Sequence, residues 1–496
     1  MPVPDPTPMT PEQRRAAAAL LASISAVPDR LGRLFARHGH ELALVGGPVR
    51  DAFLGRLPVG DLDMTTDAPP ERVLEITKDW ADAVWLVGVA FGTVGLRKGD
   101  AVLEITTYRS EQYDRTSRKP DVTYGTSLTD DLARRDFTVN AMAATLPNYD
   151  LVDPFGGLSD LKDMVLRTPG RPQDSFGDDP LRILRAARFV AELGLEPAPG
   201  LRAAMTELAP RLEIVSAERI SAELGKLLLA ARSGGPSAGI ALLVETGVAD
   251  YFLPEIPGLQ LEQDEHHRHK DVYRHSLTVL DQAISLEQEY SLERDLRLRL
   301  AALLHDIGKP KTRSILPDGR VAFHHHDMVG AKLTRLRLKA LRFPGDVITD
   351  VANLVELHLR FHGFGTGEWT DSAVRRYVTD AGPLLTRLHA LTRADCTTRN
   401  RAKAQRLALS YDILERRIAE LADQEELDRV RPDLNGTEIM ALLGIQPGPL
   451  VGKAYAYLRE LRLEHGPLGK ERATQELLRW AQGAGLGGTG GPGRAG

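Results

Sequence analysis

The clearest hydrophobic pattern in the chain is a short apolar run at residues 43–45, which stops at a pair of glycines. An amphipathic segment follows at residues 48–57, and it begins with a proline, which the first turn of a helix tolerates. It leads to Asp61 and Asp63, which an apolar leucine separates. The pattern predicts a strand, a glycine turn, a helix and a second strand on which both aspartates face the same side.

These two aspartates and the glycines before them predict a site for a metal ion and phosphate. Carboxylates that share a face repel each other unless a cation lies between them, and a hard divalent ion with oxygen ligands suits Asp61 and Asp63. Gly46 and Gly47 let the backbone approach a ligand closely and present N–H groups to phosphate oxygens.

A second alternating pattern lies at residues 102–106, after a predicted strand and turn at residues 84–95. Leu103 and Ile105 fall on one face of the predicted strand and Glu104 falls on the other. Glu104 is therefore a candidate third carboxylate beside the two aspartates. The alternative is a glutamate that faces solvent on an edge strand.

Residues 131–141 are rich in charge and are expected to open a helix. In such a helix Asp136 and Asn140 lie four residues apart on one face, and Arg134 and Arg135 lie near its start. Cations at the start of a helix are unfavourable with its dipole, so these arginines need an external anion, which a triphosphate supplies. The alternative is an ordinary cluster of surface ion pairs.

Asp179 precedes a proline at the predicted start of a helix in which Arg182, Arg185 and Arg188 recur every three residues. Cytosine and adenine each present a donor amine beside a ring-nitrogen acceptor. A carboxylate next to a guanidinium matches that pattern and leaves unpaired groups against uracil or guanine. Asp179 and Arg182 are thus predicted to select CTP and ATP. The alternative is that the aspartates complement the helix dipole and the arginines are solvated.

These motifs together resemble a known signature. The run LVGGPVRD followed by DLDM resembles that of the nucleotidyltransferase superfamily and is most similar to class II tRNA CCA-adding enzymes and bacterial poly(A) polymerases. The resemblance extends to the motif Glu-Asp-x-x-Arg, in which Asp178 replaces the glutamate here. It implies that Mg²⁺ is held by Asp61 and Asp63, with Glu104, and that the incoming nucleotide is bound by Gly46, Gly47, Arg50, Arg135, Asp136, Asn140, Asp179, Arg182, Arg185 and Arg188.

A second concentration of candidate ligands follows a polar run at residues 262–270. The order of histidine, histidine–aspartate and a distant aspartate resembles the HD superfamily of metal-dependent phosphohydrolases. A buried helix at residues 300–304 is expected to deliver His305 and Asp306 to the site, with Gly308 ending it. Imidazole and carboxylate together suit a second divalent metal. The resemblance implies ligands at His275, His305, Asp306 and Asp395, with His326 and His358 as outer members.

A basic segment at residues 332–342 holds five cations and no acid. One face is predicted to cover the core while the other contacts RNA phosphates; the alternative is a solvated surface helix. Arg399, Asn400 and Arg401 are expected to extend the patch. Its cations are Lys332, Arg335, Arg337, Lys339 and Arg342.

The composition limits the classes of function. A chain of 496 residues with 42% apolar and 26% charged residues is expected to form several globular domains. The formal net charge of −5 confines any RNA surface to a local basic patch. One cysteine, no membrane-length apolar run and no signal-peptide pattern predict a cytoplasmic protein without a membrane partner, and no DNA partner is expected.

The sequence therefore predicts an α+β protein: a nucleotidyltransferase head with a mixed sheet and helices, then an all-α neck, an HD region and a C-terminal helical region. The predicted function is Mg²⁺-dependent addition or repair of CCA at the tRNA 3′ end with CTP and ATP. The alternatives are a poly(A) polymerase or an A-only or C-only enzyme, an HD phosphohydrolase, and a noncatalytic RNA-binding protein. The expected boundaries are 1–10 (disordered), 11–168 (head), 169–265 (neck), 266–402 (HD), 403–482 (C-terminal helices) and 483–496 (disordered).

Overall fold

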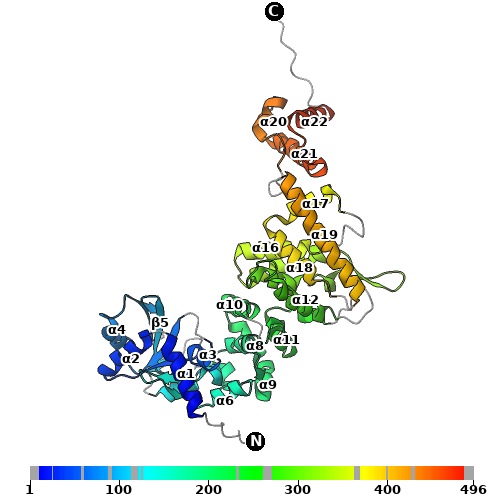
Figure 1. Cartoon of the computed structure of the whole chain (residues 1–496). Helices are drawn as coiled ribbons and strands as arrows, with labels where there is room; N and C mark the ends of the chain where they lie inside the picture. Colours follow the sequence, from blue (N-terminus) through cyan, green and yellow to red (C-terminus); the bar gives the residue numbers. More distant parts are fainter. Residues whose placement is uncertain are drawn as a thin grey trace, which may run out of the picture. The chain divides into compact units, whose positions relative to one another are not determined.

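The computed structural model divides into two compact units, Met1–Pro257 and Gly258–Gly496 (Figure 1). Predictions that fall on residues 1–9, 262–270, 485–496 or Arg399 lie outside the described residues. The described residues are 10–24, 26–56, 61–87, 92–112, 121–124, 127–230, 234–260, 271–361, 369–397, 400–425 and 431–484.

The head of the first unit contains a seven-stranded mixed sheet in the order β3-β4-β5-β2-β1-β8-β9. Strands β2 and β5 run parallel, and the other neighbours in this sheet run antiparallel. The strands are β1 (Leu42–Val45), β2 (Leu62–Thr66), β3 (Ala83–Val87), β4 (Thr93–Lys98), β5 (Ala101–Thr107), β8 (Ala143–Thr145) and β9 (Asp150–Val152), beside a separate pair, β6 (Arg109–Gln112) and β7 (Asp121–Tyr124).

One face of this sheet packs against α1 (Pro11–Ile24), α2 (Ala26–Arg37), α3 (Gly47–Phe53) and α4 (Pro70–Thr77). Because side chains alternate along a strand, every second residue of β2, β4 and β5 enters the core beneath these helices. The predicted inward face of residues 102–106 is confirmed. The strand residues buried there are Leu62, Met64, Val94, Leu96, Leu103 and Ile105.

The opposite face is covered at its β1 side, where Ala43 and Val45 pack with Leu132 of α5 (Leu128–Ala133). The glycine turn leads from β1 into α3 (Gly47–Phe53), which is shorter than the predicted helix because Gly55, with a φ of 69°, follows its end. On the β2–β5–β4–β3 side, the same face carries several exposed or half-exposed polar residues.

Helices follow the head, as predicted. In this neck, α8 packs against α10 and α11. A short parallel pair, β10 (Val165–Leu166) with β11 (Glu196–Pro197), interrupts the helices. The helices are α6 (Gly157–Lys162), α7 (Pro172–Asp178), α8 (Leu181–Leu193), α9 (Pro199–Leu208), α10 (Ala217–Leu228) and α11 (Pro236–Glu245).

The second unit is helical apart from a hairpin of β12 (Arg313–Ile315) and β13 (Val321–Phe323). The α+β prediction is confirmed. No helix in the described part of the chain has the length and apolar content needed to cross a bilayer. The helices of this unit are α12 (Val272–Leu286), α13 (Leu296–Leu304), α14 (Lys309–Thr312), α15 (His326–Ala340), α16 (Gly345–Leu357), α17 (Asp371–Ala381), α18 (Leu385–Ala394), α19 (Arg401–Glu425), α20 (Gly436–Leu443), α21 (Pro449–His465) and α22 (Lys470–Gly483).

Candidate functional site

Three carboxylates lie together on the open face of the head sheet. Asp61 directly precedes β2 and Asp63 lies within it; both are exposed, while Leu62 between them is buried. Glu104 of β5 is the register partner of Asp63, so the two side chains occupy the same face. The structure thus brings together all three residues that the sequence singled out as acidic ligands.

The electrostatics of these carboxylates fit a divalent cation. Desolvation raises the pKa of Asp63 above its ordinary value; Arg135 acts against this shift and Asp61 adds to it. Desolvation also raises the pKa of Glu104, and the charges of Asp63 and Asp61 raise it further. Carboxylates that oppose one another's ionisation are stabilised by a cation among them, and oxygen ligands suit a hard divalent ion.

Arg135 lies between these carboxylates and the glycine turn. Gly46 has a φ of 73°, and a Cβ atom there would lie 3.4 Å from Nη1 of Arg135. Nη2 of Arg135 donates to Oδ2 of the fully buried Asp131 at 3.3 Å. Its Nε is buried and has no hydrogen-bond partner among the described residues. The turn therefore leaves room for a guanidinium beside the acidic site, anchored by an aspartate that the sequence analysis did not single out.

The predicted helix at residues 131–141 is wrong. The helix here is α5, whose N-cap is Ser127, and Arg134 forms its C-cap. A separate 3-10 turn spans Thr138–Asn140. The two arginines thus follow the C-terminal end of a helix, where its dipole favours cations, so no external anion is needed to explain them.

A chain of polar contacts joins the glycine-turn helix to α8. Nη1 of Arg50 donates to Oδ1 of Asn140 at 2.8 Å, and Nδ2 of Asn140 donates to Oδ1 of Asp136 at 3.2 Å. Nε of Arg185 donates to Oδ2 of Asp136 at 2.8 Å. Burial opposes the ionisation of Asp136, but the charge and hydrogen bonds of Arg185 hold its pKa below its ordinary value. Four of the predicted nucleotide-binding residues are therefore connected to one another.

Asp179 and Arg182 each have separate partners. Oδ1 of Asp179 accepts from the backbone N–H of Leu181 at 3.2 Å, and Arg219 of α10 donates to its Oδ2 at 3.1 Å. Nη2 of Arg182 donates to the carbonyl oxygen of Arg134 at 2.6 Å. Arg219 thus braces the aspartate of the pair, while Arg182 is tied to the segment that carries Arg135.

The last two arginines of the predicted basic stripe surround Phe189. The guanidinium carbons of Arg185 and Arg188 lie 5.7 and 4.8 Å from the centre of its ring. Nε of Arg188 lies 3.3 Å from Oε2 of Glu223, a buried residue of α10. The alternative of solvated arginines is thus wrong for Arg188, which is buried beside an acidic partner that the sequence analysis did not single out.

The second unit brings its six predicted metal ligands into one cluster. Its members come from the ends of several helices and fall into two groups, in each of which the candidate ligand atoms lie within 4.8 Å of one another. His326 and His358, predicted as outer members, form a group with the central aspartate. The two groups are His275, His305 and Asp395, and Asp306, His326 and His358.

Three of these histidines have the same orientation. Nδ1 of His305, His326 and His358 lies 2.9, 2.8 and 2.6 Å from the carbonyl oxygen three residues earlier. A proton on Nδ1 satisfies each carbonyl and leaves Nε2 as an acceptor, which is the form that ligates metals. Nε2 of His358 is buried without a hydrogen-bond partner among the described residues. These ring orientations fit a divalent metal site.

The charges in the cluster support the same interpretation. Burial opposes protonation of His305, but Asp306 and Asp395 raise its pKa to about 9. Nζ of Lys309 lies 2.8 Å from Oδ2 of Asp306, a contact that the sequence analysis did not anticipate. Burial and the charge of His305 lower the pKa of His358 to about 4. The buried carboxylates thus draw positive charge toward themselves, which is the condition that a bound cation satisfies.

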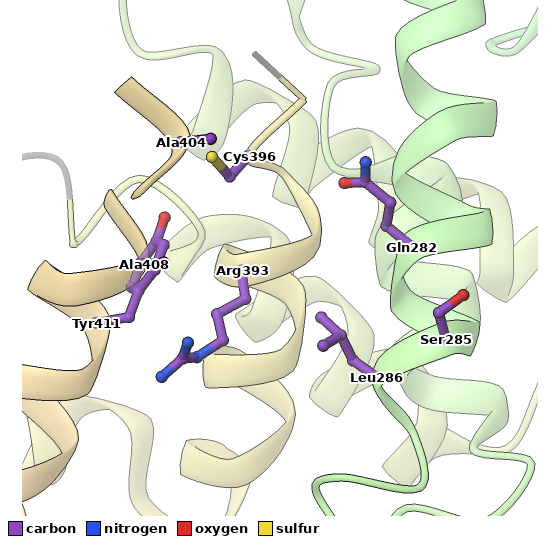
Figure 2. Close-up of a pocket in the computed structure, with 8 residues that line it drawn as sticks. All are labelled: Gln282, Ser285, Leu286, Arg393, Cys396, Ala404, Ala408 and Tyr411. Atoms are coloured by element: carbon purple, nitrogen blue, oxygen red, sulfur yellow. The ribbon is translucent and has the colours of Figure 1, made fainter. Parts of the chain in front are cut away.

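A cavity of about 320 Å³ in the second unit is lined by residues of α12, α18 and α19 and by the segment between the last two (Figure 2). Gln282 and Leu286 line it from α12, Cys396 from the end of α18, and Ala408 and Tyr411 from α19. Cys396 follows a candidate metal ligand directly. Gln282 is seven residues, or about 10 Å along a helix, from another, His275.

Residues 332–340 of the predicted basic helix form the last part of α15, which ends at Ala340, so the predicted end at residue 342 is wrong; Arg342 follows the helix with a φ of 60°. Lys332, Arg335, Lys339 and Arg342 are exposed, and Arg337 is half-buried. Nη2 of Arg335 donates to Oδ1 of Asn353 at 2.9 Å. Contact between this helix and RNA stays a prediction.

Family models match three parts of the chain. Residues 42–167 match the poly A polymerase head domain, residues 194–259 match the probable RNA and SrmB-binding site of polymerase A, and residues 272–426 match the HD domain. The first match contains the three carboxylates of the head, and the third contains the six-residue cluster.

Relatives of known activity match along most of the chain. An A-adding tRNA nucleotidyltransferase of Deinococcus radiodurans is 36% identical, with 89% of this chain and 95% of the relative covered. A CC-adding tRNA nucleotidyltransferase of Thermus thermophilus is 32% identical, with 88% and 93% covered. The CCA-adding enzyme of Anoxybacillus flavithermus is 43% identical over 44% of this chain and 53% of the relative.

Among solved structures, the crystal structure of the Bacillus stearothermophilus CCA-adding enzyme in complex with CTP has a TM-score of 0.64 and 25% identity. The match covers 96% of this chain and 99% of the Bacillus stearothermophilus chain. The Thermotoga maritima CCA-adding enzyme complexed with tRNA has a TM-score of 0.59 at 18% identity, with 94% and 98% covered, and supports the fold alone.

Proposed function

The chain belongs to the family of class II tRNA nucleotidyltransferases, and on that premise we propose that it builds or repairs the CCA end of tRNA with CTP and ATP. The observation that carries the proposal is the placement of Asp61, Asp63 and Glu104 on one open face. The charges of Arg135 and Arg185 both oppose the rise in the pKa of Asp63 that desolvation causes. This electrostatic contact supports the assignment of the metal ligands and the predicted base-reading helix to one site.

In the proposed mechanism, Asp61 and Asp63, with Glu104, hold a divalent ion, which we assign as Mg²⁺. When bound, such an ion makes the RNA 3′-hydroxyl a better nucleophile and neutralises charge on the triphosphate. Arg135 orients the phosphates from beside the glycine turn. Its anchor, the buried Asp131, keeps that guanidinium at the edge of the acidic site.

Base selection is assigned to Asp179 and Arg182. The Asp179 carboxylate accepts from a base amine, and the Arg182 guanidinium donates to a ring nitrogen, as the pairing edges of cytosine and adenine require. Arg219 holds Asp179 from α10, and the Arg134 carbonyl holds Arg182, so the protein itself orients both groups. This arrangement needs no nucleic-acid template.

The test is incorporation of labelled nucleotide by the purified chain. tRNA ending before, within or after CCA is incubated with CTP, ATP or both, in Mg²⁺ and after chelation. We expect CMP on tRNA without CCA, AMP on tRNA ending in CC, and no addition to mature tRNA or after chelation.

The test also separates the related activities. The two relatives that match along most of the chain are named as an A-adding and a CC-adding tRNA nucleotidyltransferase, so addition of one nucleotide type alone would assign a narrower role of that kind. Long A tails would indicate a poly(A) polymerase. Absence of any incorporation would contradict the proposal. The cytoplasmic location predicted from the sequence is consistent with tRNA as the proposed substrate.

A second activity, hydrolysis of a phosphoester in the second unit, is supported by the six-ligand cluster and the cavity in the same unit. The cavity volume of about 320 Å³ accommodates a nucleobase, and its walls are largely apolar, with polar residues at Gln282, Ser285 and Arg393. Release of phosphate from nucleotides or RNA ends, measured with added Mn²⁺, Ni²⁺ or Mg²⁺, tests this assignment. This hydrolysis assay is independent of the assay for nucleotide addition.

A further inference from the structure

The register of the head sheet places an exposed tryptophan in the same row as the acidic site. Asp63 pairs with Glu104, Glu104 pairs with Gly95, and Gly95 pairs with Trp85 across four adjacent strands. Directly paired residues project from the same face of a sheet. Trp85 therefore lies on the carboxylate face, two strands and about 10 Å from Glu104.

Gly95 allows the indole to lie against the sheet between these positions. A Cβ atom on Gly95 would lie 2.3 Å from Nε1 and 2.4 Å from Cε2 of Trp85. The indole thus covers β4 where that strand has no side chain. Even so, 38% of Trp85 is exposed, and Arg97, two residues after the glycine, is exposed on the same face.

The two sides of the acidic site differ in what they can bind. On the β1 side lie the glycine turn, Arg135 and, through Arg185, α8, which together suit a nucleoside triphosphate. On the β5 side lie Glu104 and then Trp85. Phosphoryl transfer places the attacking and leaving oxygens roughly in line, so the acceptor hydroxyl must approach from the side opposite the pyrophosphate. That side is the one that carries the tryptophan.

We propose that Trp85 is the surface on which the unpaired base at the 3′ end of the acceptor RNA stacks, which places its hydroxyl at the carboxylates. The assignment rests on the proposed nucleotidyl transfer. A stacking surface suits this substrate because each addition presents a new terminal base, and an aromatic face accepts every base. Arg97 supplies a cation beside it for the RNA backbone.

The first test compares variants at one strand. Trp85→Ala is expected to raise the KM for tRNA lacking CCA about 10-fold, with the KM for CTP unchanged, because base–aromatic stacking is lost. Trp85→Phe keeps an aromatic face and is expected to restore most of the affinity. Leu86→Ala is the matched control, since Leu86 is 51% exposed on the other face of the strand. It is expected to behave as the wild type.

A second variant distinguishes loss of the stacking surface from misfolding of Trp85→Ala. Gly95→Ala puts a methyl group where the indole lies and is expected to raise the RNA KM to a similar extent. Combined with Trp85→Ala it should add little, because both changes remove the same contact. An acceptor with an abasic 3′-terminal nucleotide should bind wild type and Trp85→Ala equally well.

The outcomes separate this inference from the function on which it rests. If the wild type adds nucleotide but Trp85→Ala keeps the wild-type RNA KM, the inference alone is wrong. A rise in the KM for CTP or ATP in place of that for RNA also overturns it, because the indole would then face the incoming nucleotide. A wild-type chain that adds nothing to tRNA overturns both.

Discussion

The carboxylates of Asp61 and Asp63 are exposed on an open sheet face, whereas Asp306 and Asp395 of the second unit lie among four histidines at the ends of helices. In the head, only the neighbouring arginines lower the pKa of Asp63, and they do so less than desolvation raises it. In the cluster, His305 and Lys309 hold the pKa of Asp306 well below its ordinary value despite burial.

This difference in exposure and in ligand type indicates which molecules each site can accommodate. An open row of oxygen ligands leaves room for a triphosphate and an RNA end to join the coordination of a hard ion. A closed set of imidazole and carboxylate ligands suits a metal that is held largely by the protein itself. The open head site would therefore leave more of an ion's coordination to other molecules than the cluster would.

The largest effect should come from removing a head carboxylate. Asp61→Ala is expected to reduce nucleotide incorporation at least about 10³-fold, because the divalent ion that activates the hydroxyl loses a ligand. Binding of tRNA, measured by filter retention, should change little. Asp100→Ala, at the exposed turn between β4 and β5, is the control and should retain full activity. Retained incorporation in Asp61→Ala would refute the assignment of the head site.

The converse change tests whether the two sites are independent. His305→Ala is expected to weaken divalent-metal binding by the second unit roughly a few hundred-fold and to abolish any phosphate release, since a buried imidazole ligand is lost. Nucleotide incorporation should stay at the wild-type rate. His324→Ala removes an exposed histidine of the same segment and should leave both unchanged. Loss of incorporation in His305→Ala would show that the second unit contributes to the transfer reaction.

A smaller effect is expected in the choice of nucleotide. Asp179→Asn replaces an acceptor oxygen with a donor amide, so the preference for CTP over UTP in kcat/KM should fall about 100-fold. Asp174→Asn removes the same charge at an exposed position of α7 and serves as the control. Unchanged selectivity in Asp179→Asn would remove this residue from base reading.

The sequence predicted the local features of both sites because they depend on short-range pattern. Alternation placed Leu103 and Ile105 inward and Glu104 outward. The buried helix before His305 is present as predicted, but it ends at Leu304 and not at Gly308. The helix start near Asp131 was wrong, although the correct signal was present. Ser127 accepts from the backbone N–H of Asp130 at 3.4 Å, the first half of a capping motif.

Other features depend on contacts between distant segments, which a single sequence does not reveal. The ion pair between Arg219 and Asp179 forms only because α10 packs near the start of α8. The ion pair between Arg188 and Glu223 depends on the packing of the same two helices. The position of Trp85 follows from the registers of three strand pairs, because a shift of one residue would move the indole to the core face.

The smallest expected effect concerns the stability of the link between the head and α8. Asp136→Asn removes the charge that Arg185 faces, and it should lower the free energy of unfolding by about 2 kcal/mol at pH 7. The folded-state pKa of Asp136 is held below its ordinary value, so the stabilisation is complete above about pH 4 and is lost as the pH falls through the folded-state pKa. The difference in melting temperature between wild type and Asp136→Asn should therefore be constant from pH 7 to pH 5 and shrink below pH 4. Asp100→Asn should melt with the wild type at every pH. A difference that grows on acidification would mean that the Asp136 carboxyl is stabilised in its protonated form.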